Sequence, residues 1–388
     1  MGDMKKIYLD YAATTPLDPK VLEAMTPFLK SDFGNASSIH EPGQKAREAI
    51  DKAREKAAEF LNCAASEIIF TGSATEANNL AVFGVVKAAK KKDVKPHIIT
   101  TKIEHHAIIE PCEVLEREGT AEITYLTVDK DGLIKPEDVQ KALKINTVLV
   151  SIMYANNEIG TIQPVVEIGQ LLKKSEVLFH TDAVQAINYL DCDVEKLGVD
   201  LLTLSGHKIY GPKGVGALYV RQGTSLAPLI YGGGQERGLR SGTENVAAIV
   251  GLGAAIAQIK TEKVKMAQLM RLRDRLIDGV LTKIPTSRLN GSRENRLPNN
   301  ANFSFEAAEG ESIVIALDQE GIAASTGSAC SSRSLEPSHV LLALGLSHEQ
   351  AHGSLRLTLG RYTTEQEIDR VLAVLPEIIV RLRKIAGR

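Results

Sequence analysis

Short runs of β-branched and aliphatic residues alternate with longer helical patterns over most of the chain. From about Glu67 onward the sequence passes through strand-like EIIFT, a helical pattern from Thr75 to Lys92, strand-like HIITT and a helical pattern around Ile108 to Arg117. Further strands are predicted in EITYLTV, NTVLVSIM, EVLFHT and VDLLTLS, with a helix in EIGQLLKKS. Strands alternating with helices form βαβ crossovers, so we expect a mostly parallel sheet covered on both faces. Ligands bind at the carboxyl ends of such strands.

The pattern changes toward the end of the chain. A long amphipathic helix is expected over Val246–Ile284, and the polar segment NGSRENRLPNN follows it at Asn290–Asn300. Beyond that segment the sequence predicts a strand in ANFSFE, a helix over Glu311–Gln319, a strand in SLRLTLG and a closing helix from Thr364. These elements together predict a smaller α+β domain at the end of the chain.

Length and composition fit a protein of two domains. At about 150 residues per domain, 388 residues give roughly two. We expect a large domain over residues 15–260 and a small domain formed by residues 1–14 and 261–388. Hydrophobic residues make up 44% and charged residues 24%, which excludes long disorder and fibrous repeats.

Charge and hydropathy exclude two classes of partner. The net charge is -2, so no overall field attracts nucleic acid or anionic membrane. No apolar stretch approaches the roughly 20 residues of a membrane span, and the start MGDMKKIYLDYA contains no apolar signal region. A cytoplasmic location is therefore expected.

The four cysteines are too few and too scattered for a disulfide framework or a zinc site. Cys63, Cys112 and Cys192 are expected to be free thiols in a reducing compartment. Cys330 differs because it lies in ASTGSACSSRS, a run of small polar residues typical of an exposed, mobile loop. Taken alone, that sequence also fits an inert loop thiol.

Two predicted strands end in residues suited to cofactor chemistry. VDLLTLS ends at Ser205 and is followed by Gly206, His207 and Lys208. A lysine beside a glycine-rich turn serves as a phosphate ligand, as a surface residue or as a Schiff-base amine. Asp182, at the end of the strand in EVLFHT, is suited to face the pyridinium nitrogen of pyridoxal phosphate, which keeps that ring an electron sink. A helix N-cap before AVQAI is the alternative for this carboxylate.

Three further segments could complete such a site. Gln185 is placed to hydrogen-bond the phenolic oxygen of the ring. TGSATEANN is a small-residue turn between a strand and a helix, where backbone amides and the Thr75 hydroxyl point toward an anion. It matches neither the dinucleotide nor the nucleoside triphosphate pattern. His105, in IEHHAI after another strand, is suited to stack on a cofactor ring.

Nine segments resemble, in order and spacing, those of NifS/IscS-like cysteine desulfurases of the class V aminotransferase family. They are YLDYAATTP, GSATEANN, IEHHAI, YANNEIGTIQP, HTDAVQ, SGHKIYGPKGVGALYV, GGGQERGLRSGTEN, STGSACSS and SLRLTLGRYTTEQEID. The resemblance runs essentially end to end, and the long loop around Cys330 is similar to that of the group I branch. It implies the fold type I architecture of pyridoxal phosphate (PLP) dependent transferases.

The resemblance also implies a role for each matching residue. Lys208 would form the Schiff base, His105 would stack on the ring and shuttle protons, and Cys330 would be the nucleophile. Arg356 would bind the substrate carboxylate. Thr243 would reach the phosphate of the neighbouring subunit, which implies a homodimer with shared sites. The residues implied to contact the cofactor are Ala74, Thr75, His105, Asn157, Asp182, Gln185, Ser205, Gly206, His207, Lys208 and Thr243, and Asn157 would contact cofactor or substrate.

The activity implied is removal of sulfur from L-cysteine, giving L-alanine and a persulfide on Cys330. The sulfur would pass to an iron–sulfur scaffold protein or another acceptor, for iron–sulfur cluster assembly and other sulfur-containing products. No resident metal is implied. The sequence leaves open the physiological acceptor, the turnover rate and whether Cys330 ligates a transient cluster.

The chain departs from the family pattern in places that bear no implied catalytic role. It has Gly72 before Ser73 where the reverse order is common, and Ala36 in FGNASS where proline is common. The sequence ends at Arg388 without the extended tail that helps some relatives to dock a scaffold, so docking is not implied as directly as the chemistry.

Three alternative functions remain. A selenocysteine lyase would use the same cofactor and related residues. A non-catalytic platform in iron–sulfur assembly is disfavoured because Lys208, Cys330, Asp182 and His105 are all present. A nicotinamide dehydrogenase is disfavoured because the chain lacks the GxGxxG fingerprint.

Overall fold

The computed structural model describes residues 6–89, 94–262, 266–327 and 336–387. Its larger sheet has seven strands in the order β2-β8-β7-β6-β5-β3-β4. Only β8 runs antiparallel to the others, so the predicted α/β fold with a mostly parallel sheet is confirmed. The strands are β2 (Ile68–Thr71), β3 (His97–Thr101), β4 (Glu122–Leu126), β5 (Thr147–Ser151), β6 (Leu178–Asp182), β7 (Leu201–Ser205) and β8 (Gly216–Val220).

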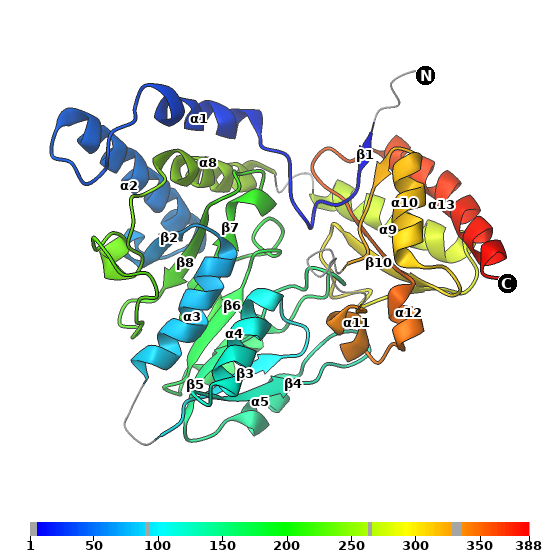
Figure 1. Ribbon diagram of the computed structural model, residues 1–388, viewed down its shortest axis with the longest axis horizontal. Coiled ribbons are helices and arrows are strands. Elements are labelled where there is room, and N and C mark those ends of the chain that lie inside the picture. The colour runs from blue at the N-terminus through cyan, green and yellow to red at the C-terminus, as the bar shows by residue number, and fades with distance from the viewer. Residues whose placement is uncertain (1–5, 90–93, 263–265, 328–335, 388) are drawn as a thin grey trace.

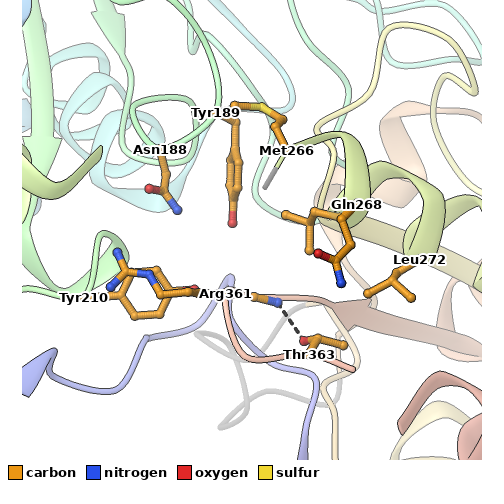
Figure 2. A pocket seen from close by; sticks show the side chains of 10 residues that line it. Asn188, Tyr189, Tyr210, Met266, Gln268, Leu272, Arg361 and Thr363 are labelled. Atoms are coloured by element: carbon orange, nitrogen blue, oxygen red, sulfur yellow. Dashed lines mark hydrogen bonds between the residues drawn. The ribbon is translucent and has the colours of Figure 1, made fainter. Parts of the chain in front are cut away.

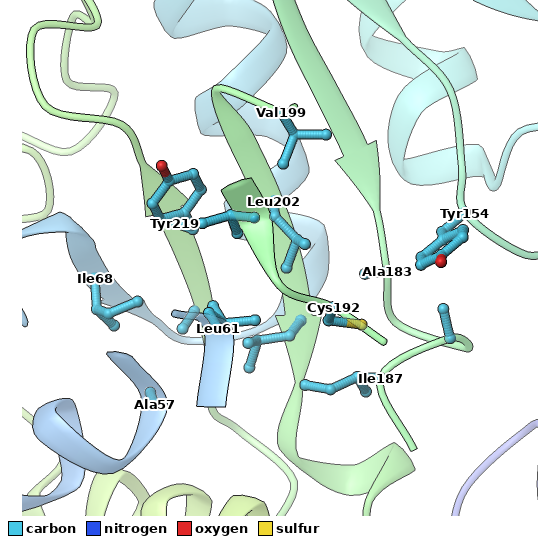
Figure 3. Close-up of a cluster of buried hydrophobic side chains, with 14 of the residues drawn as sticks. Ala57, Leu61, Ile68, Tyr154, Ala183, Ile187, Cys192, Val199, Leu202 and Tyr219 are labelled. Carbon is cyan, nitrogen blue, oxygen red and sulfur yellow. The ribbon is translucent and has the colours of Figure 1, made fainter. Parts of the chain in front are cut away.

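Both faces of this sheet are buried. Alternate residues of one strand enter different cores: Leu202 packs with the helices on one face, and Leu201 with those on the other. Figure 3 shows part of the first core, where Ile68, Leu202 and Tyr219 lie near α2. The helices of that face are α1 (Pro19–Lys30), α2 (Glu41–Leu61), α5 (Pro136–Ala142), α6 (Val165–Leu172), α7 (Val194–Leu197) and α8 (Val246–Glu262); those of the other are α3 (Ala74–Ala88) and α4 (His106–Arg117).

A second core lies beside the large sheet (Figure 1). It is built on an antiparallel sheet of β12 (Ser354–Thr358), β10 (Asn300–Phe305) and β9 (Ser287–Leu289). The first strand of the chain, β1 (Ile7–Tyr8), pairs in parallel with β11 (Ile322–Ala323) and so joins the C-terminal elements. Helices α9 (Met266–Lys283), α10 (Gly310–Gln319) and α13 (Glu365–Ile385) complete this core. The domain boundaries given above remain a prediction.

Some elements differ from those expected. The segment predicted as one helix over Val246–Ile284 is divided between α8 and α9, with residues 263–265 outside the described part. The end of the helix predicted over Thr75–Lys92 also falls partly outside it, at residues 90–93. The closing helix predicted from Thr364 is confirmed as α13, and Thr364 and Glu367 form a capping box at its start. Helices α1, α2, α5, α7, α11 (His339–Ala343) and α12 (His348–His352) were not predicted.

Among the described residues, no helix is long and apolar enough to cross a membrane.

A buried ion pair fixes the loop between β8 and α8. Both oxygens of Glu236 accept hydrogen bonds from Arg54 on α2, each at 2.7 Å, and one also accepts from the Phe70 backbone N–H at 2.9 Å. Glu236 and its neighbour Arg237 both have left-handed backbones, with φ of 44° and 57°. Such conformations are costly for non-glycine residues, so the loop depends on this contact.

We predict that Glu236→Gln lowers the free energy of unfolding by about 3 kcal/mol, because it leaves the mostly buried Arg54 without its charge partner. Glu48→Gln is the matched control, since Glu48 pairs with Lys52 on the exposed side of α2. Its effect should be below about 0.5 kcal/mol. Urea unfolding measures both variants, and equal losses would contradict the importance of the buried pair.

Candidate active site

Most of the predicted site residues line one cavity of about 430 Å³. The cavity lies where the carboxyl ends of β2, β3, β5, β6 and β7 meet the segments that follow them. The predicted residues in its wall are Ala74, Thr75, His105, Asn157, Asp182, Gln185, Ser205, His207, Lys208 and Arg356. The arrangement follows from parallel pairing, which brings the ends of distant strands to one edge of the sheet.

Lys208 stands directly after β7, in a short 3₁₀ turn over Gly206–Lys208. Its ammonium group donates to the backbone carbonyls of Ala12 and Ala13, the latter at 2.8 Å. The N-terminal segment of the chain therefore holds the amine at the cavity wall. Gln185 points to the same place, because its side-chain amide donates to the Ala12 carbonyl at 3.0 Å.

Asp182 ends β6 and is buried. One carboxylate oxygen accepts from the Asn78 side chain at 2.7 Å, and the other from the Val184 backbone N–H at 2.9 Å. The alternative of a helix N-cap is wrong, because the residues after Asp182 form turns instead of a helix. The carboxylate caps a turn and also faces the cavity.

His105 is the N-cap of α4. Its Nδ1 accepts a hydrogen bond from the Ala107 backbone N–H at 3.0 Å, so the proton of the neutral ring lies on Nε2. Burial lowers the pKa of His105, the charge of Lys208 lowers it further and that of Asp182 opposes the shift. The neutral imidazole is therefore the form that stands in the cavity at pH 7.

An anion cradle forms at the start of α3. Ser73 caps the helix by accepting from the Glu76 N–H, and the backbone N–H groups of Ala74 and Thr75 begin the first turn. Gly216 of β8 passes directly beneath: a Cβ there would lie 2.7 Å from the Ser73 carbonyl carbon and 2.8 Å from the Ala74 nitrogen. Only glycine allows this approach.

Ser205 and His207 face the cradle from the end of β7. The Ser205 side chain is buried. His207 pairs through Nδ1 with the Thr14 hydroxyl at 3.2 Å. Burial, with smaller contributions from Lys208 and Lys213, lowers the pKa of His207 to about 4. A neutral ring at pH 7 provides one N–H donor and one acceptor.

Arg356 reaches the cavity from β12, across from the large sheet. Its guanidinium pairs with Asp10 at 2.9 Å and donates to the Asn157 carbonyl at 3.0 Å and the Gly327 carbonyl at 3.4 Å. Its Nε is buried and has no hydrogen-bond partner among the described residues. This Nε is therefore a donor that an incoming acceptor would satisfy.

Three predicted residues are not in the cavity wall. Gly206 lies behind it, where a Cβ would come within 2.9 Å of the Pro212 carbonyl oxygen and of the Val215 side chain. Thr243 is exposed, in the loop that Glu236 anchors. Cys330 lies outside the described residues.

The chain resembles known proteins over nearly its whole length. The family Aminotransferase class-V matches residues 7–371. The chain belongs to this family. The cysteine desulfurase IscS of Dictyoglomus turgidum is 55% identical over 98% of this chain and 96% of its own length. The cysteine desulfurase IscS of Methanosarcina thermophila is 52% identical over 98% of this chain and 94% of its own.

Solved structures of related enzymes share the fold. A NifS-like protein, 40% identical, superposes with a TM-score of 0.90 over 97% of this chain and all of its own. The structure of SspA in complex with cysteine, 41% identical, superposes with a TM-score of 0.81 over 93% and 100%. The predicted resemblance to NifS/IscS-like class V enzymes is confirmed.

Several buried polar residues of this family member were not predicted. Asn78 lies one helical turn beyond Ala74, and a polar residue buried within an apolar helix is the sequence signal that could have identified it. Glu104 is fully buried, and burial raises its pKa to about 8 even though it accepts from Thr101 and from the Met153 backbone. Glu158 stands in the cavity wall next to Asn157.

A smaller cavity, of about 70 Å³, shares no lining residue with the site (Figure 2). Arg361 stacks on the Tyr210 ring with its guanidinium carbon 4.0 Å from the centroid, and its backbone N–H donates to the Tyr210 hydroxyl at 2.6 Å. Arg361 also forms a buried ion pair with Asp18 at 2.5 Å. These contacts join the C-terminal part of the chain to the start of α1 and to the segment between β7 and β8.

His180 generates a prediction on pH. It is buried on β6, its ring nitrogens pair with the hydroxyls of Ser151 and Thr203, and burial lowers its pKa to about 3. An unfolded histidine has a pKa near 6.5, so between about pH 6.5 and 3 only the unfolded chain binds this proton. Stability therefore falls as the pH falls through that window.

Between pH 7 and pH 5, the free energy of unfolding should fall by about 2 kcal/mol less in His180→Gln than in the parent protein. Urea unfolding at the two pH values measures this difference. The same substitution at the exposed His348 controls for loss of an imidazole. An unchanged pH dependence in His180→Gln would show that this ring is protonated in the folded protein.

Proposed function

We propose that this protein is a PLP-dependent cysteine desulfurase that removes sulfur from free L-cysteine, releases L-alanine and leaves a persulfide on Cys330. The observation that supports this most directly is that Lys208, Asp182, His105 and Arg356 share one cavity with an anion cradle. The relatives named cysteine desulfurase IscS, and the neighbour solved with cysteine, point to the same substrate.

The donor set fits PLP. The N-terminus of α3, the Ser205 hydroxyl and the His207 ring suit a phosphate, and the backbone of Gly216 makes room beneath them. Asp182 suits a protonated ring nitrogen, and Asn78 keeps a buried side-chain oxygen that has no partner among the described residues. Lys208 would hold the aldehyde carbon. Bound there, PLP would withdraw electrons from the carbon skeleton of the substrate amine.

The substrate would be oriented by Arg356 and Asn157. The Arg356 Nε, which is buried without a described partner, would donate to one carboxylate oxygen of cysteine. Asp10 and the Asn157 carbonyl fix the other end of the guanidinium, so the group is held before the substrate arrives. This rigidity reduces the ordering cost of binding.

Two groups would move protons. Lys208 Nζ, once released by the incoming amine, would accept the proton from the substrate Cα. His105 carries a proton on Nε2, because its Nδ1 is engaged by the Ala107 N–H. A neutral ring can give that proton and regain it near pH 7, which suits a shuttle.

Sulfur transfer would need a thiol that reaches the cavity. Gly327 lines the cavity, and three residues of chain span at most about 11 Å, so a thiol at position 330 is within reach. The Cys330 thiolate would attack the substrate sulfur. A sulfur–sulfur bond forms, the carbon–sulfur bond breaks, and its electron pair remains on the substrate carbon, which takes up a proton and leaves as alanine.

The assembly that we propose is a cytoplasmic homodimer. Thr243 is exposed and lies outside the cavity of its own chain, which fits a residue that serves the partner's phosphate. The name IscS among the relatives supports an iron–sulfur scaffold as one sulfur acceptor.

Cys330→Ser tests the function. We expect it to keep bound cofactor and its absorbance change with L-cysteine, because those depend on Lys208, Asp182 and the cradle. Alanine formation should fall at least about a hundredfold, since a hydroxyl is a far poorer nucleophile toward sulfur. Alanine is measured by chromatography after incubation with L-cysteine.

The other three cysteines provide the matched controls. Burial raises the pKa of Cys63 and of Cys112 to about 12, so neither has an activated thiolate near pH 7. Cys192 is buried and does not line the cavity. Serine at each should leave alanine formation within about twofold of the parent. Parent-level alanine formation by Cys330→Ser would instead favour direct elimination of sulfide.

Mixed dimers test the shared site. A heterodimer of one Lys208→Ala subunit and one Thr243→Ala subunit would, if sites are shared, contain one site with both lesions and one with neither. The heterodimer is isolated through a different affinity tag on each subunit. We expect it to have about half the activity of the parent dimer. Activity no higher than half that of the Thr243→Ala homodimer would mean that each site uses its own Thr243.

A further inference from the structure

The N-terminal segment Asp10–Thr15 contacts both sheets where they meet at the active-site cavity. It lies within YLDYAATTP, one of the nine strings that resemble the family. On one side the segment follows β12 of the small sheet, where the Thr358 backbone N–H donates to the Leu9 carbonyl at 2.7 Å. On the other side it meets the turn after β7. There the backbone N–H and the hydroxyl of Thr15 donate to the His207 carbonyl, at 3.0 and 2.9 Å.

Within this segment, Ala12 contacts both sides at once. Its buried backbone N–H donates to the Thr358 hydroxyl at 2.9 Å. Its carbonyl accepts from the Gln185 side-chain amide at 3.0 Å and from the Lys208 ammonium. The backbone of a single residue therefore connects the small sheet to two side chains that stand in the cavity wall beside the large sheet.

Thr358 is fully buried and stands two residues after Arg356 on β12. Residues two apart on a strand point to the same face, so the hydroxyl and the guanidinium leave β12 on the same side. The strand itself is held by its ladder with β10, in which Thr358 pairs with Asn300. The acceptor for the Ala12 N–H and the guanidinium of Arg356 are thus two points on one rigid element.

We propose that Thr358 is a positioning residue, which acts through Ala12 to fix the place of Arg356 relative to Gln185 and Lys208. This rests on the proposed function in that Arg356 binds the substrate carboxylate and Gln185 contacts the cofactor ring. Without the hydroxyl, the Ala12 N–H would be buried without an acceptor, so its backbone would turn toward another partner and move its carbonyl. A displacement of about 1 Å can lower a rate about a hundredfold.

Two substitutions of Thr358 test the hydroxyl itself. Thr358→Val keeps the shape of the side chain and removes the acceptor, and alanine formation from L-cysteine should fall about tenfold or more. Thr358→Ser keeps the hydroxyl and should stay within about twofold of the parent. Thr100→Val is the matched control, because Thr100 is buried on β3 and its hydroxyl has no partner among the described residues. Equal activity in the Val and Ser variants of Thr358 would contradict the proposal.

The absorbance of the bound cofactor separates positioning from a loss of stability. Gln185→Ala removes a hydrogen-bond donor to the ring and should shift the absorbance maximum. Thr358→Val should shift the maximum in the same direction, because it displaces the carbonyl that orients the Gln185 amide. The double variant should show no larger shift than Gln185→Ala alone, since both changes act on one contact. A maximum at the parent position in Thr358→Val would overturn the proposal.

Hydrogen exchange tests the contact independently of activity. In Thr358→Val the Ala12 amide should exchange faster than in the parent, and so should the Tyr210 amide, which donates to the Thr15 hydroxyl at 2.8 Å. Amides of α12 should not change. Faster exchange at Ala12 alone would overturn the proposal, because the effect would not reach the segment after β7. If the parent forms no alanine from L-cysteine, the proposed function fails, and exchange at Tyr210 still decides the role of Thr358.

Discussion

Parallel pairing of the central strands is the constraint on which the site depends. Six strands point the same way, so the residues that follow them gather at one edge although they are far apart along the chain. Asp182 is the last residue of β6, and His105 and Lys208 follow the ends of β3 and β7 within four residues. Because both faces of the sheet are buried, the strand ends form a rigid base, and small movements of the catalytic groups are resisted by the whole core.

Burial then sets the chemistry of the groups placed there. The pKa values of His105 and His207 are lowered, which keeps both rings neutral at pH 7. In each case a hydrogen bond to Nδ1 also constrains the ring's orientation. A cavity that contained several imidazolium groups would repel the Lys208 ammonium, whereas neutral rings can exchange protons without that cost.

The sequence predicted the features that depend on residues close together along the chain. Strand ends, the helix start at Thr75 and the lysine after VDLLTLS are visible within ten residues, and the strings around them indicate the family. The unpredicted β8 follows a glycine-rich turn and runs against the parallel pattern. Asn78 and Glu158 were not predicted because their partners, Asp182 and Ser338, lie 104 and 180 residues away along the chain. The role of a buried polar residue depends on its hydrogen-bond partner, which a local stretch of sequence does not show.

The contacts of the N-terminal segment have a consequence for biosynthesis. Ala12 and Ala13 hold Lys208 from nearly 200 residues away, and Asp10 pairs with Arg356 across 346 residues. The N-terminal segment is synthesised first, but its contact with Arg356 can form only after nearly the whole chain has been made. Contacts of such long range form late in folding and slowly. A chain that ended before β12 would lack Arg356, and with it the partner of Asp10 and one part of the cavity wall.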